Sequence, residues 1–388
     1  MPRSTLAESQ SLDDLARLLD EPHGDADGRA QRLADAELPQ GCDSLVLCGA
    51  GWLGRRLLEG LRRGGIEPIA FADNAKHLHG TRVDGLLVRS VEDAAEQLPS
   101  ATFVVSVYNP SALSLQLRSL GVMPASARAL TFANPSTLLP QNAIDLPSRL
   151  LSDASLVRRG ASVWADDHSR REYGHLVRWH LLLDSAPLPP GLSEETYFPT
   201  GIVAVGPNEH FVDCGAFDGD SLKNFLQLSG GRFGRIDALE PDRENAARLR
   251  SYVASLNVAS RNKIYVHEVA VGAERTTLRF HEGAGPGSSV TSGGEHEVTC
   301  VPLDEELANT CPSYLKVDVE GAELDVLAGA RRLIAEHAPT LAIVLYHHMA
   351  DLWTVPLAIK QIRPDYELYL RRYAEDCWET VCYAVVRK

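Results

Sequence analysis

The chain has 388 residues, of which 44% are hydrophobic and 23% charged, so it can bury a large core and we expect two domains. The formal net charge of −14 opposes tight binding to nucleic acid, because such surfaces need Lys and Arg to neutralise phosphates. The longest apolar runs are too short to span a bilayer, and the N-terminus lacks the apolar core of a signal peptide. Seven cysteines, an odd number and never spaced C-x-x-C, predict reduced thiols, so a cytoplasmic protein is expected.

Residues 1–40 predict a polar, partly helical segment, and residues 41–135 show the pattern of a Rossmann-like domain. A strand from Ser44 is followed by three glycines that open a helix, and the next strand ends in Asp73. Such glycines allow a tight turn and close approach to a pyrophosphate, and Asp73 has the spacing of a ribose-binding carboxylate. A second nucleotide site is therefore a hypothesis for Gly49, Gly51, Gly54 and Asp73.

The continuation of this domain, Asp73 to Gly80 and then Gly85 to Val88, resembles the N-terminal Rossmann-like domain of PglD-type sugar acyltransferases. The resemblance implies a docking or nucleotide-sugar site more often than a redox site. Three interpretations stay open: a structural module with an empty cleft, a nucleotide-sugar site, or a dinucleotide site. Residues 136–200 then form a helical connector. Its predicted helix from Ala165 carries His168, Arg171, His175 and Arg178 on one face. We favour a solvated or interdomain face, and a cationic face towards a phosphate or carboxylate of the acceptor is the alternative.

Residues 201–388 predict a second α/β domain. Its first strand ends in Asp213 and enters a D-x-G-x-x-x-G turn containing Gly215 and Gly219. Glycines let the backbone approach a ligand, and Asp213 can accept a hydrogen bond from the amino-acid end of a cofactor. The next strand ends in Glu240, whose carboxylate can accept both ribose hydroxyls of an adenosine. The glycine pattern lacks the spacing of a dinucleotide site, which favours an adenosyl ligand without pyrophosphate.

A later segment places charges on a strand. Lys316, Asp318 and Glu320 alternate with apolar residues, and Gly321 separates this run from a helix. One interpretation is that this segment is an edge strand whose charged side chains face solvent. A strand that feeds directly into a helix more often lies inside the sheet, where charges must be paired or used.

These motifs resemble, in the same order, those of the FkbM family of S-adenosylmethionine-dependent methyltransferases, over about residues 195–388. The motifs are Phe211-Val-Asp-Cys-Gly-Ala-Phe-Asp-Gly-Asp-Ser221, Leu239-Glu-Pro241, Ala270-Val-Gly272, Pro302-Leu-Asp-Glu-Glu-Leu307 and Lys316-Val-Asp-Val-Glu-Gly-Ala-Glu323. The resemblance implies a class I methyltransferase fold. The last two predicted strands are joined by a loop too short for a parallel crossover, so they should form an antiparallel hairpin.

The expected fold class is therefore α/β with two doubly wound domains. The N-terminal one is Rossmann-like, and the C-terminal one is a class I methyltransferase domain with a mostly parallel seven-stranded sheet and a terminal antiparallel hairpin. The expected cofactor is S-adenosyl-L-methionine. The residues predicted to contact it are Asp213, Gly215, Ala216, Phe217, Gly219, Ser221, Glu240, Pro241, Val269 and Asp318.

Transfer of a methyl group to a hydroxyl needs a general base within hydrogen-bond reach of the acceptor. Asp318 and Glu320 follow one strand and His347 follows the next, so they are neighbours if the two strands pair. We predict His347 or Asp318 as the proton acceptor, with Lys316 pairing with a carboxylate and setting its pKa. A divalent cation held by Asp318, Glu320 and a histidine is an alternative, but the spacing does not demand one and we predict no metal.

The predicted activity is O-methylation of a hydroxyl on a sugar, glycan or natural product. N-methylation of an amide or peptide is an alternative. Two further alternatives are a dinucleotide-dependent oxidoreductase and a nucleotide-sugar-binding module with a vestigial methyltransferase half. The expected partners are a small-molecule or glycan acceptor and a nucleotide-sugar at the N-terminal domain, with no nucleic acid and no membrane span. A homo-oligomer stays open.

Overall fold

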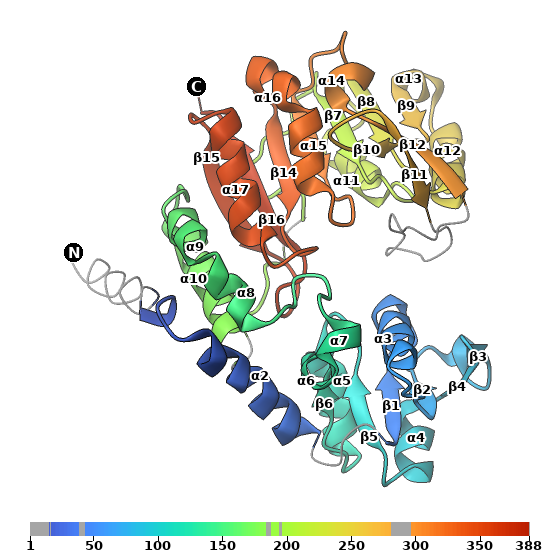
Figure 1. Cartoon of the computed structure of the whole chain (residues 1–388). Helices are drawn as coiled ribbons and strands as arrows, with labels where there is room; N and C mark the ends of the chain where they lie inside the picture. Colours follow the sequence, from blue (N-terminus) through green and yellow to red (C-terminus); the bar gives the residue numbers. More distant parts are fainter. Residues whose placement is uncertain are drawn as a thin grey trace. The chain divides into compact units, whose positions relative to one another are not determined.

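The computed structural model describes residues 15, 17–38, 43–183, 188–193, 196–280 and 296–387 (Figure 1). The chain divides into two compact units. The first contains the residues up to Ser155, Gly174–Gly191 and Ala374–Trp378, and the second contains Leu156–Tyr173, Leu192–Tyr373 and the residues from Glu379. The chain therefore passes between the units more than once. The predicted boundaries at residues 40, 135 and 200 stay predictions.

The first unit contains a six-stranded sheet with the order β3-β4-β2-β1-β5-β6. All neighbouring pairs are parallel except β3 and β4, which are antiparallel. The central strands are buried along their whole length, as expected of parallel strands covered on both faces. The strands are β1 (Leu45–Cys48), β2 (Ala70–Ala72), β3 (Arg82–Val83), β4 (Leu86–Arg89), β5 (Thr102–Val105) and β6 (Ala125–Ser126).

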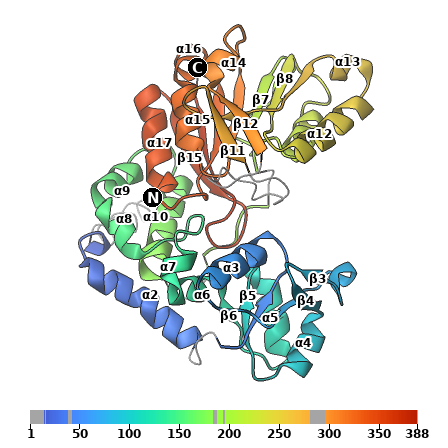
Figure 2. The same cartoon turned by 45° about the vertical axis from the view of Figure 1, so that its right-hand side comes forward.

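Helices α3, α4 and α5 of the first unit alternate with its strands, whereas α6, α7 and α8 follow β6 one after another. The helices of this unit are α2 (His23–Glu37), α3 (Trp52–Arg63), the 3₁₀ helix η1 (Lys76–Leu78), α4 (Val91–Gln97), α5 (Pro110–Ser119), α6 (Ala127–Ala133), α7 (Pro135–Leu138) and α8 (Pro147–Ser152). In Figure 2, α2 runs along α6 and α8, and it packs against both. Three buried alanines, at positions 26, 30 and 34, form the contact face of α2.

The turn between β1 and α3 depends on two of its three glycines. Gly49 has a φ of +119°, and a Cβ there would lie 2.7 Å from the carbonyl oxygen of Ser106. A Cβ on Gly54 would lie 1.9 Å from the carbonyl oxygen of Gly49, so α3 could not start so close to β1. Gly51 has open space around the equivalent position. Two of the glycines are thus explained by packing alone.

We expect Gly54→Ala to lower the free energy of unfolding by about 3 kcal/mol, because the added methyl group cannot fit against backbone. Gly51→Ala is the matched control and should change this free energy by less than about 0.5 kcal/mol, since its φ is −76° and its surroundings are open. Urea denaturation of both variants measures the difference. Equal losses would contradict the packing explanation.

The second unit contains a seven-stranded sheet with the order β15-β16-β14-β13-β7-β8-β9. Pairs from β14 to β9 are parallel, whereas β16 is antiparallel to both of its neighbours. The parallel sheet and the reversed strand of the terminal hairpin agree with the prediction. The strands are β7 (His210–Cys214), β8 (Arg235–Leu239), β9 (Ile264–His267), β13 (Tyr314–Val317), β14 (Thr340–Val344), β15 (Glu367–Arg372) and β16 (Thr380–Val385).

The charged strand lies inside this sheet. β13 pairs with β7 on one side and with β14 on the other, and all four of its residues are buried. The edge-strand interpretation is therefore wrong. Lys316 is only 2% exposed, whereas Asp318 and Glu320 lie beyond the end of the strand.

A three-stranded sheet and several helices complete the second unit. The small sheet contains β10 (Ala270–Val271), β12 (His296–Val301) and β11 (Thr276–Phe280), in that order. Helices α15, α16 and α17 pack against one another (Figure 1). The helices are α11 (Asp220–Leu228), α12 (Arg243–Ser255), α13 (Val258–Arg261), α14 (Leu303–Glu306), α15 (Glu323–Gly329), α16 (Arg331–His337) and α17 (Asp351–Ile362).

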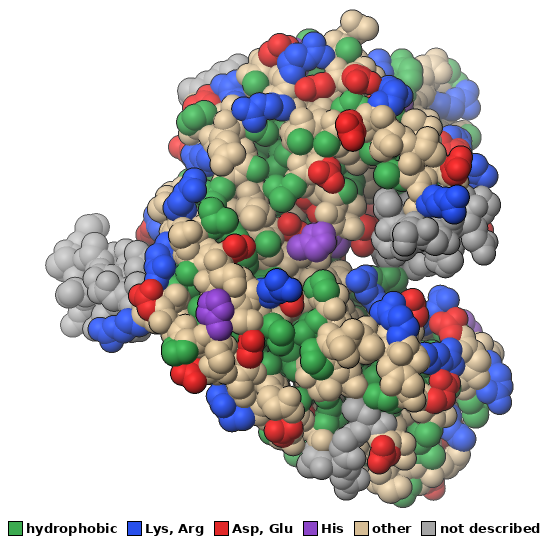
Figure 3. Space-filling view, viewed as in Figure 1, with side chains coloured by type: hydrophobic (Ala, Val, Ile, Leu, Met, Phe, Trp, Pro, Cys, Tyr) green, Lys and Arg blue, Asp and Glu red, His purple; other side chains and the backbone are tan. Residues whose placement is uncertain are grey.

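Two helices connect the units along the chain, α9 (Ala154–Ala161) and α10 (Asp167–Leu182). On α10, the predicted cationic positions Arg171, His175 and Arg178 are exposed, and the fourth, His168, is half-buried. Lys, Arg, Asp and Glu side chains are interspersed over the face of the molecule in Figure 3. Among the described residues, no helix combines the length and apolar character that a membrane span requires.

Candidate active site

The site of the second unit is built on an ion pair in the interior of its sheet. Asp213, at the end of β7, is fully buried, and its Oδ1 lies 3.1 Å from Nζ of Lys316 on the neighbouring strand β13. Ser221 Oγ donates a hydrogen bond to Oδ2 of Asp213, and Lys316 Nζ donates one to the Gly215 carbonyl oxygen at 2.6 Å. Burial alone would lower the pKa of Lys316, but Asp213 and Asp318 hold it above its ordinary value. The lysine therefore carries its charge at neutral pH.

We expect Lys316→Met to lower the free energy of unfolding by about 3–5 kcal/mol, because it leaves the Asp213 carboxylate buried without a cation. Adding Asp213→Asn to this variant should recover most of the loss. Lys223→Met is the matched control, since Lys223 pairs with Asp218 at the surface and such pairs contribute at most about 1 kcal/mol. Urea denaturation measures all three. A loss as small as that of the control would show that the pair is not needed.

The turn after β7 is shaped by its contacts with neighbouring loops. Gly215 has a φ of +79°, and a Cβ there would lie 1.8 Å from the carbonyl oxygen of Asp318. A Cβ on Gly219, which has a φ of +90° and precedes α11, would lie 2.8 Å from a Leu249 methyl group. Both glycines thus allow close packing of protein against protein. Between them, Ala216 is buried and Phe217 has a φ of +47°.

Glu240, at the end of β8, is held by backbone amides. Its Oε2 accepts a hydrogen bond from Phe217 N at 2.8 Å, and its Oε1 accepts one from Asp242 N at 2.9 Å. The side chain is 5% exposed, and burial raises its pKa although the two amides oppose the shift. A carboxylate oxygen has two lone pairs, so Oε2 can accept one more donor. This arrangement fits the binding of a ribose hydroxyl. Pro241 follows directly, and the half-buried Val269 follows β9.

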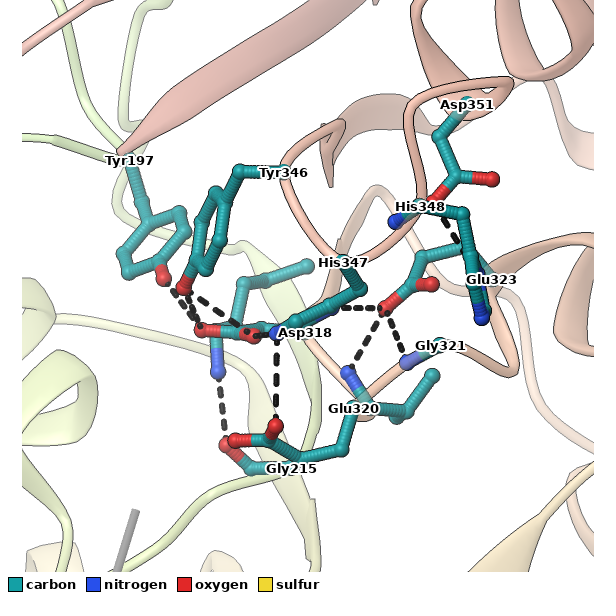
Figure 4. Close-up of polar contacts among 12 residues, drawn as sticks. Tyr197, Gly215, Asp318, Glu320, Gly321, Glu323, Tyr346, His347, His348 and Asp351 are labelled. Atoms are coloured by element: carbon teal, nitrogen blue, oxygen red, sulfur yellow. Dashed lines mark hydrogen bonds and ion pairs between the residues drawn. The ribbon is translucent and has the colours of Figure 1, made fainter. Parts of the chain in front are cut away.

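Asp318 follows β13 and is held by two tyrosines (Figure 4). Tyr197 OH donates a hydrogen bond to Oδ2 at 2.7 Å, and Tyr346 OH lies 3.4 Å from the same atom. The Lys316 ammonium lies over the Tyr197 ring, 5.0 Å from its centroid. The Asp318 side chain is 21% exposed, so it is the part of this group that solvent or an acceptor can reach.

His347 follows β14 and is surrounded by carboxylates. Its Nδ1 lies 2.8 Å from Glu323 Oε1, and its Nε2 lies 3.6 Å from Asp318 Oδ1 and 3.5 Å from Glu320 Oε2 (Figure 4). Burial alone would lower the pKa of His347, but these carboxylates, Glu323 foremost, raise it to about 10. An imidazolium has no lone pair with which to accept a proton. Of the two predicted bases, the geometry therefore favours Asp318.

The raised pKa of His347 predicts a pH-dependent stability. Its charged form stabilises the fold fully below a pH of about 6.5, the unfolded value, and this contribution is lost as the pH rises towards 10. We expect the wild type to lose on the order of 4 kcal/mol over this window and His347→Gln to lose much less. Urea denaturation at several pH values measures both. Parallel curves for the two proteins would contradict the assignment.

Strand pairing thus brings together four of the predicted residues, Lys316, Asp318, Glu320 and His347. Two other acids of the site were not among the predicted site residues. Glu323 is fully buried in the first turn of α15, and Glu379, just before β16, has a pKa that burial and Asp318 raise to about 7. Glu323 belongs to the motif quoted above, but no periodicity marked it as buried. Glu379 comes from the hairpin, far away in sequence.

The residues of the predicted second nucleotide site lie in the first unit, at the carboxyl ends of β1 and β2. Gly49 and Asp73 line a cavity of about 240 Å³ together with residues after β5 and on α5. The polar side chains among its lining are Asp73, Asn74, Asn109 and Gln116. Asp73 accepts hydrogen bonds from the amides of Ala50 and Ala75, so its carboxylate supports the glycine turn.

A third segment of the first unit comes from the C-terminal hairpin. The loop Ala374–Trp378 lies between β15 and β16 in sequence but packs in the first unit. Its Glu375 accepts a hydrogen bond from Ser111 N, in the first turn of α5, at 2.9 Å. Trp378 packs edge-on against Tyr108, with ring centroids 4.4 Å apart.

The turns after β7, β8 and β13 contain three of the motifs quoted above, in the same order along the chain. Residues 213–371 match the family model described as the Methyltransferase FkbM domain. The FkbM match therefore covers Asp213, Glu240, Lys316, Asp318 and His347 but not the first unit. No curated protein matches the chain.

Solved structures extend the FkbM likeness in fold. Methyltransferase FkbM from Methylobacillus flagellatus is 24% identical to this chain with a TM-score of 0.69, and the match covers 98% of this chain and 99% of that one. The two chains thus share a fold along their whole length. A putative rRNA methylase from Clostridium thermocellum matches at 10% identity, 46% and 88% coverage and a TM-score of 0.30. Aeropyrum pernix fibrillarin, solved with S-adenosyl-L-methionine, is 12% identical with a TM-score of 0.29. The match covers 48% of this chain and 70% of that one. Neither of the last two likenesses carries an argument here.

Proposed function

We propose that the second unit is an S-adenosylmethionine-dependent methyltransferase and that its acceptor is a hydroxyl of a sugar, glycan or natural product. The observation that carries the proposal is the FkbM match over residues 213–371, together with a Glu240 carboxylate held by two backbone amides at the end of β8. When bound, the cofactor supplies the electrophilic methyl group.

The residues of this chain have separate roles in the proposed reaction. Glu240 binds the ribose hydroxyls, and the backbone from Gly215 to Ser221 lies along the cofactor. Asp213 is buried against Lys316 and acts on the cofactor through the turn that it supports. Asp318 accepts the proton of the acceptor hydroxyl. Its carboxylate is partly exposed, as is that of Glu320, but Asp318 is the one that Tyr197 holds in place by a hydrogen bond. Tyr197 and the His347 imidazolium orient it.

Binding of S-adenosylhomocysteine tests the cofactor site. We expect this ligand to raise the thermal midpoint of the wild type, because it binds only the folded state. Glu240→Gln should abolish most of the rise, since an amide accepts fewer hydroxyl hydrogen bonds than a carboxylate. Glu244→Gln, an exposed residue in the next helix, is the control and should keep it. Full retention of the shift in Glu240→Gln would refute the proposed ribose contact.

Turnover tests the base. Asp318→Asn should bind S-adenosylhomocysteine like the wild type but lower the methylation rate of an accepted substrate by about 100-fold or more, because positioned general bases contribute on the order of 10²–10⁴-fold. A panel of sugars, polyketides and peptides, scored by release of S-adenosylhomocysteine, identifies the acceptor. Methylation of peptide amides alone would favour the alternative of N-methylation.

For the first unit we propose a small polar ligand at the cavity beside Gly49 and Asp73. A nucleotide-sugar is the leading candidate and a dinucleotide the alternative. The supporting observation is the position of the cavity at the carboxyl ends of parallel strands, where ligands of such sheets bind. No Lys or Arg is among the described residues that line it, so the phosphates of either ligand would depend on backbone amides of the turn from Gly49 to Gly54. Thermal shifts with a UDP-sugar, with NADH and with free nucleosides distinguish these ligands from a purely structural module.

A further inference from the structure

Glu323 is fully buried, but only one of its carboxylate oxygens is used. Its Oε1 accepts a hydrogen bond from Val319 N at 3.1 Å and lies 2.8 Å from His347 Nδ1. Its Oε2 is buried and has no hydrogen-bond partner among the described residues. A buried polar atom without a hydrogen-bond partner lowers the free energy of unfolding by about 1–3 kcal/mol. A ligand bound to this oxygen would remove that loss.

Two side chains lie on the side of Glu323 away from His347 (Figure 4). They are His348, in the loop after β14, and Asp351, the first residue of α17. Ligand atoms of Glu323, His348 and Asp351 all lie within 4.8 Å of one another. His348 Nδ1 lies 3.4 Å from Asp351 Oδ2, which also accepts a hydrogen bond from the His348 amide at 2.8 Å.

We propose that Glu323, His348 and Asp351 bind a first-row divalent transition-metal ion, such as Zn²⁺ or Mn²⁺. Two carboxylates balance the charge of such an ion, and an imidazole ligand favours it over Ca²⁺ and Mg²⁺. Glu323 and Asp351 are buried and begin two helices, α15 and α17, that pack together, so two of the three ligands are held firmly. The His348 side chain is 54% exposed, which gives the ion an entry path and room for water ligands.

A second set of possible ligands shares Glu323 but is less suited to a cation. Asp318, Glu323 and His347 also lie within 4.8 Å of one another. Glu323 Oε1 already contacts His347, however, and Asp318 accepts a hydrogen bond from Tyr197. In the other set His348 and Asp351 contact each other, but Glu323 Oε2 has no partner among the described residues. The unpartnered oxygen of Glu323 therefore selects the set on the side of His348. This is not the cation site that the sequence suggested, which used Asp318 and Glu320.

The ion would position the active site without touching the acceptor. Glu323 Oε1 holds both His347 and the amide of Val319, in the turn between Asp318 and Glu320. An ion on Oε2 fixes the same carboxylate from its other side. The metal site does not depend on methyl transfer, so it can be tested whether or not the proposed activity is found.

The test uses the full chain, stripped with a chelator and titrated with Zn²⁺ or Mn²⁺ alone. Calorimetry should show saturable binding with one ion at this site, and the ion should raise the thermal midpoint. His348→Ala and Asp351→Asn should each weaken binding by roughly tenfold or more. Ca²⁺ should not bind comparably. His337→Ala, which removes an exposed histidine from the last turn of α16, is the matched control and should leave the affinity unchanged.

Absence of saturable binding of both ions to the wild type would overturn the proposal. An affinity unchanged in His348→Ala and Asp351→Asn would overturn it as well, because the ion would then sit elsewhere. Asp351→Asn keeps an acceptor for the His348 amide, and His348 is exposed, so both variants should fold. Far-ultraviolet circular dichroism checks this, and a single folded variant is enough to decide.

Discussion

The second unit depends on the charged pair between Lys316 and Asp213 in the middle of its sheet. Neither charge reaches water, and each is stabilised by the other at 3.1 Å and by hydrogen bonds to Ser221 and the Gly215 carbonyl. The pair ties β7 to β13, and the lysine also holds the Gly215 carbonyl in the turn after β7. The turns that follow these two strands carry the proposed cofactor and acceptor contacts. The pair therefore positions the site by joining the two strands that present it.

Around this pair, carboxylates outnumber cations. Asp318, Glu320, Glu323 and Glu379 lie near the imidazolium of His347. Like charges so close together raise the pKa of some members and hold a proton on the histidine. The proton on His347 is thus a consequence of its surroundings, and it changes the role that the residue can play. A histidine at the end of a strand looks like a base in a sequence, but here it is suited to orient Asp318.

The sequence predicted much of this arrangement because local patterns carry it. Alternating strands and helices predicted both parallel sheets, and the short loop before β16 predicted the reversed strand. The expected pairing of two parallel strands predicted that Asp318 and Glu320 would lie near His347, since parallel strands align their carboxyl ends. The roles of Glu323 and Glu379 could not be predicted in this way. Burial of Glu323 depends on how α15 packs against α17, and Glu379 is brought in by a hairpin from the far end of the chain. The protonation of His347 depends on distances that no sequence pattern encodes.

The loop Ala374–Trp378 prevents the chain from being cut into two fragments that correspond to the two units. It interrupts the second unit between two paired strands, β15 and β16, and contributes Trp378 and Glu375 to the first unit. No single cut in the chain can therefore separate the units cleanly. A fragment that began at Leu192 would carry a tryptophan without its aromatic neighbour and a carboxylate without the helix end that it caps. Insertions or deletions in this hairpin would be felt at α5, more than 250 residues earlier in the chain, as the Glu375–Ser111 separation of 264 residues shows.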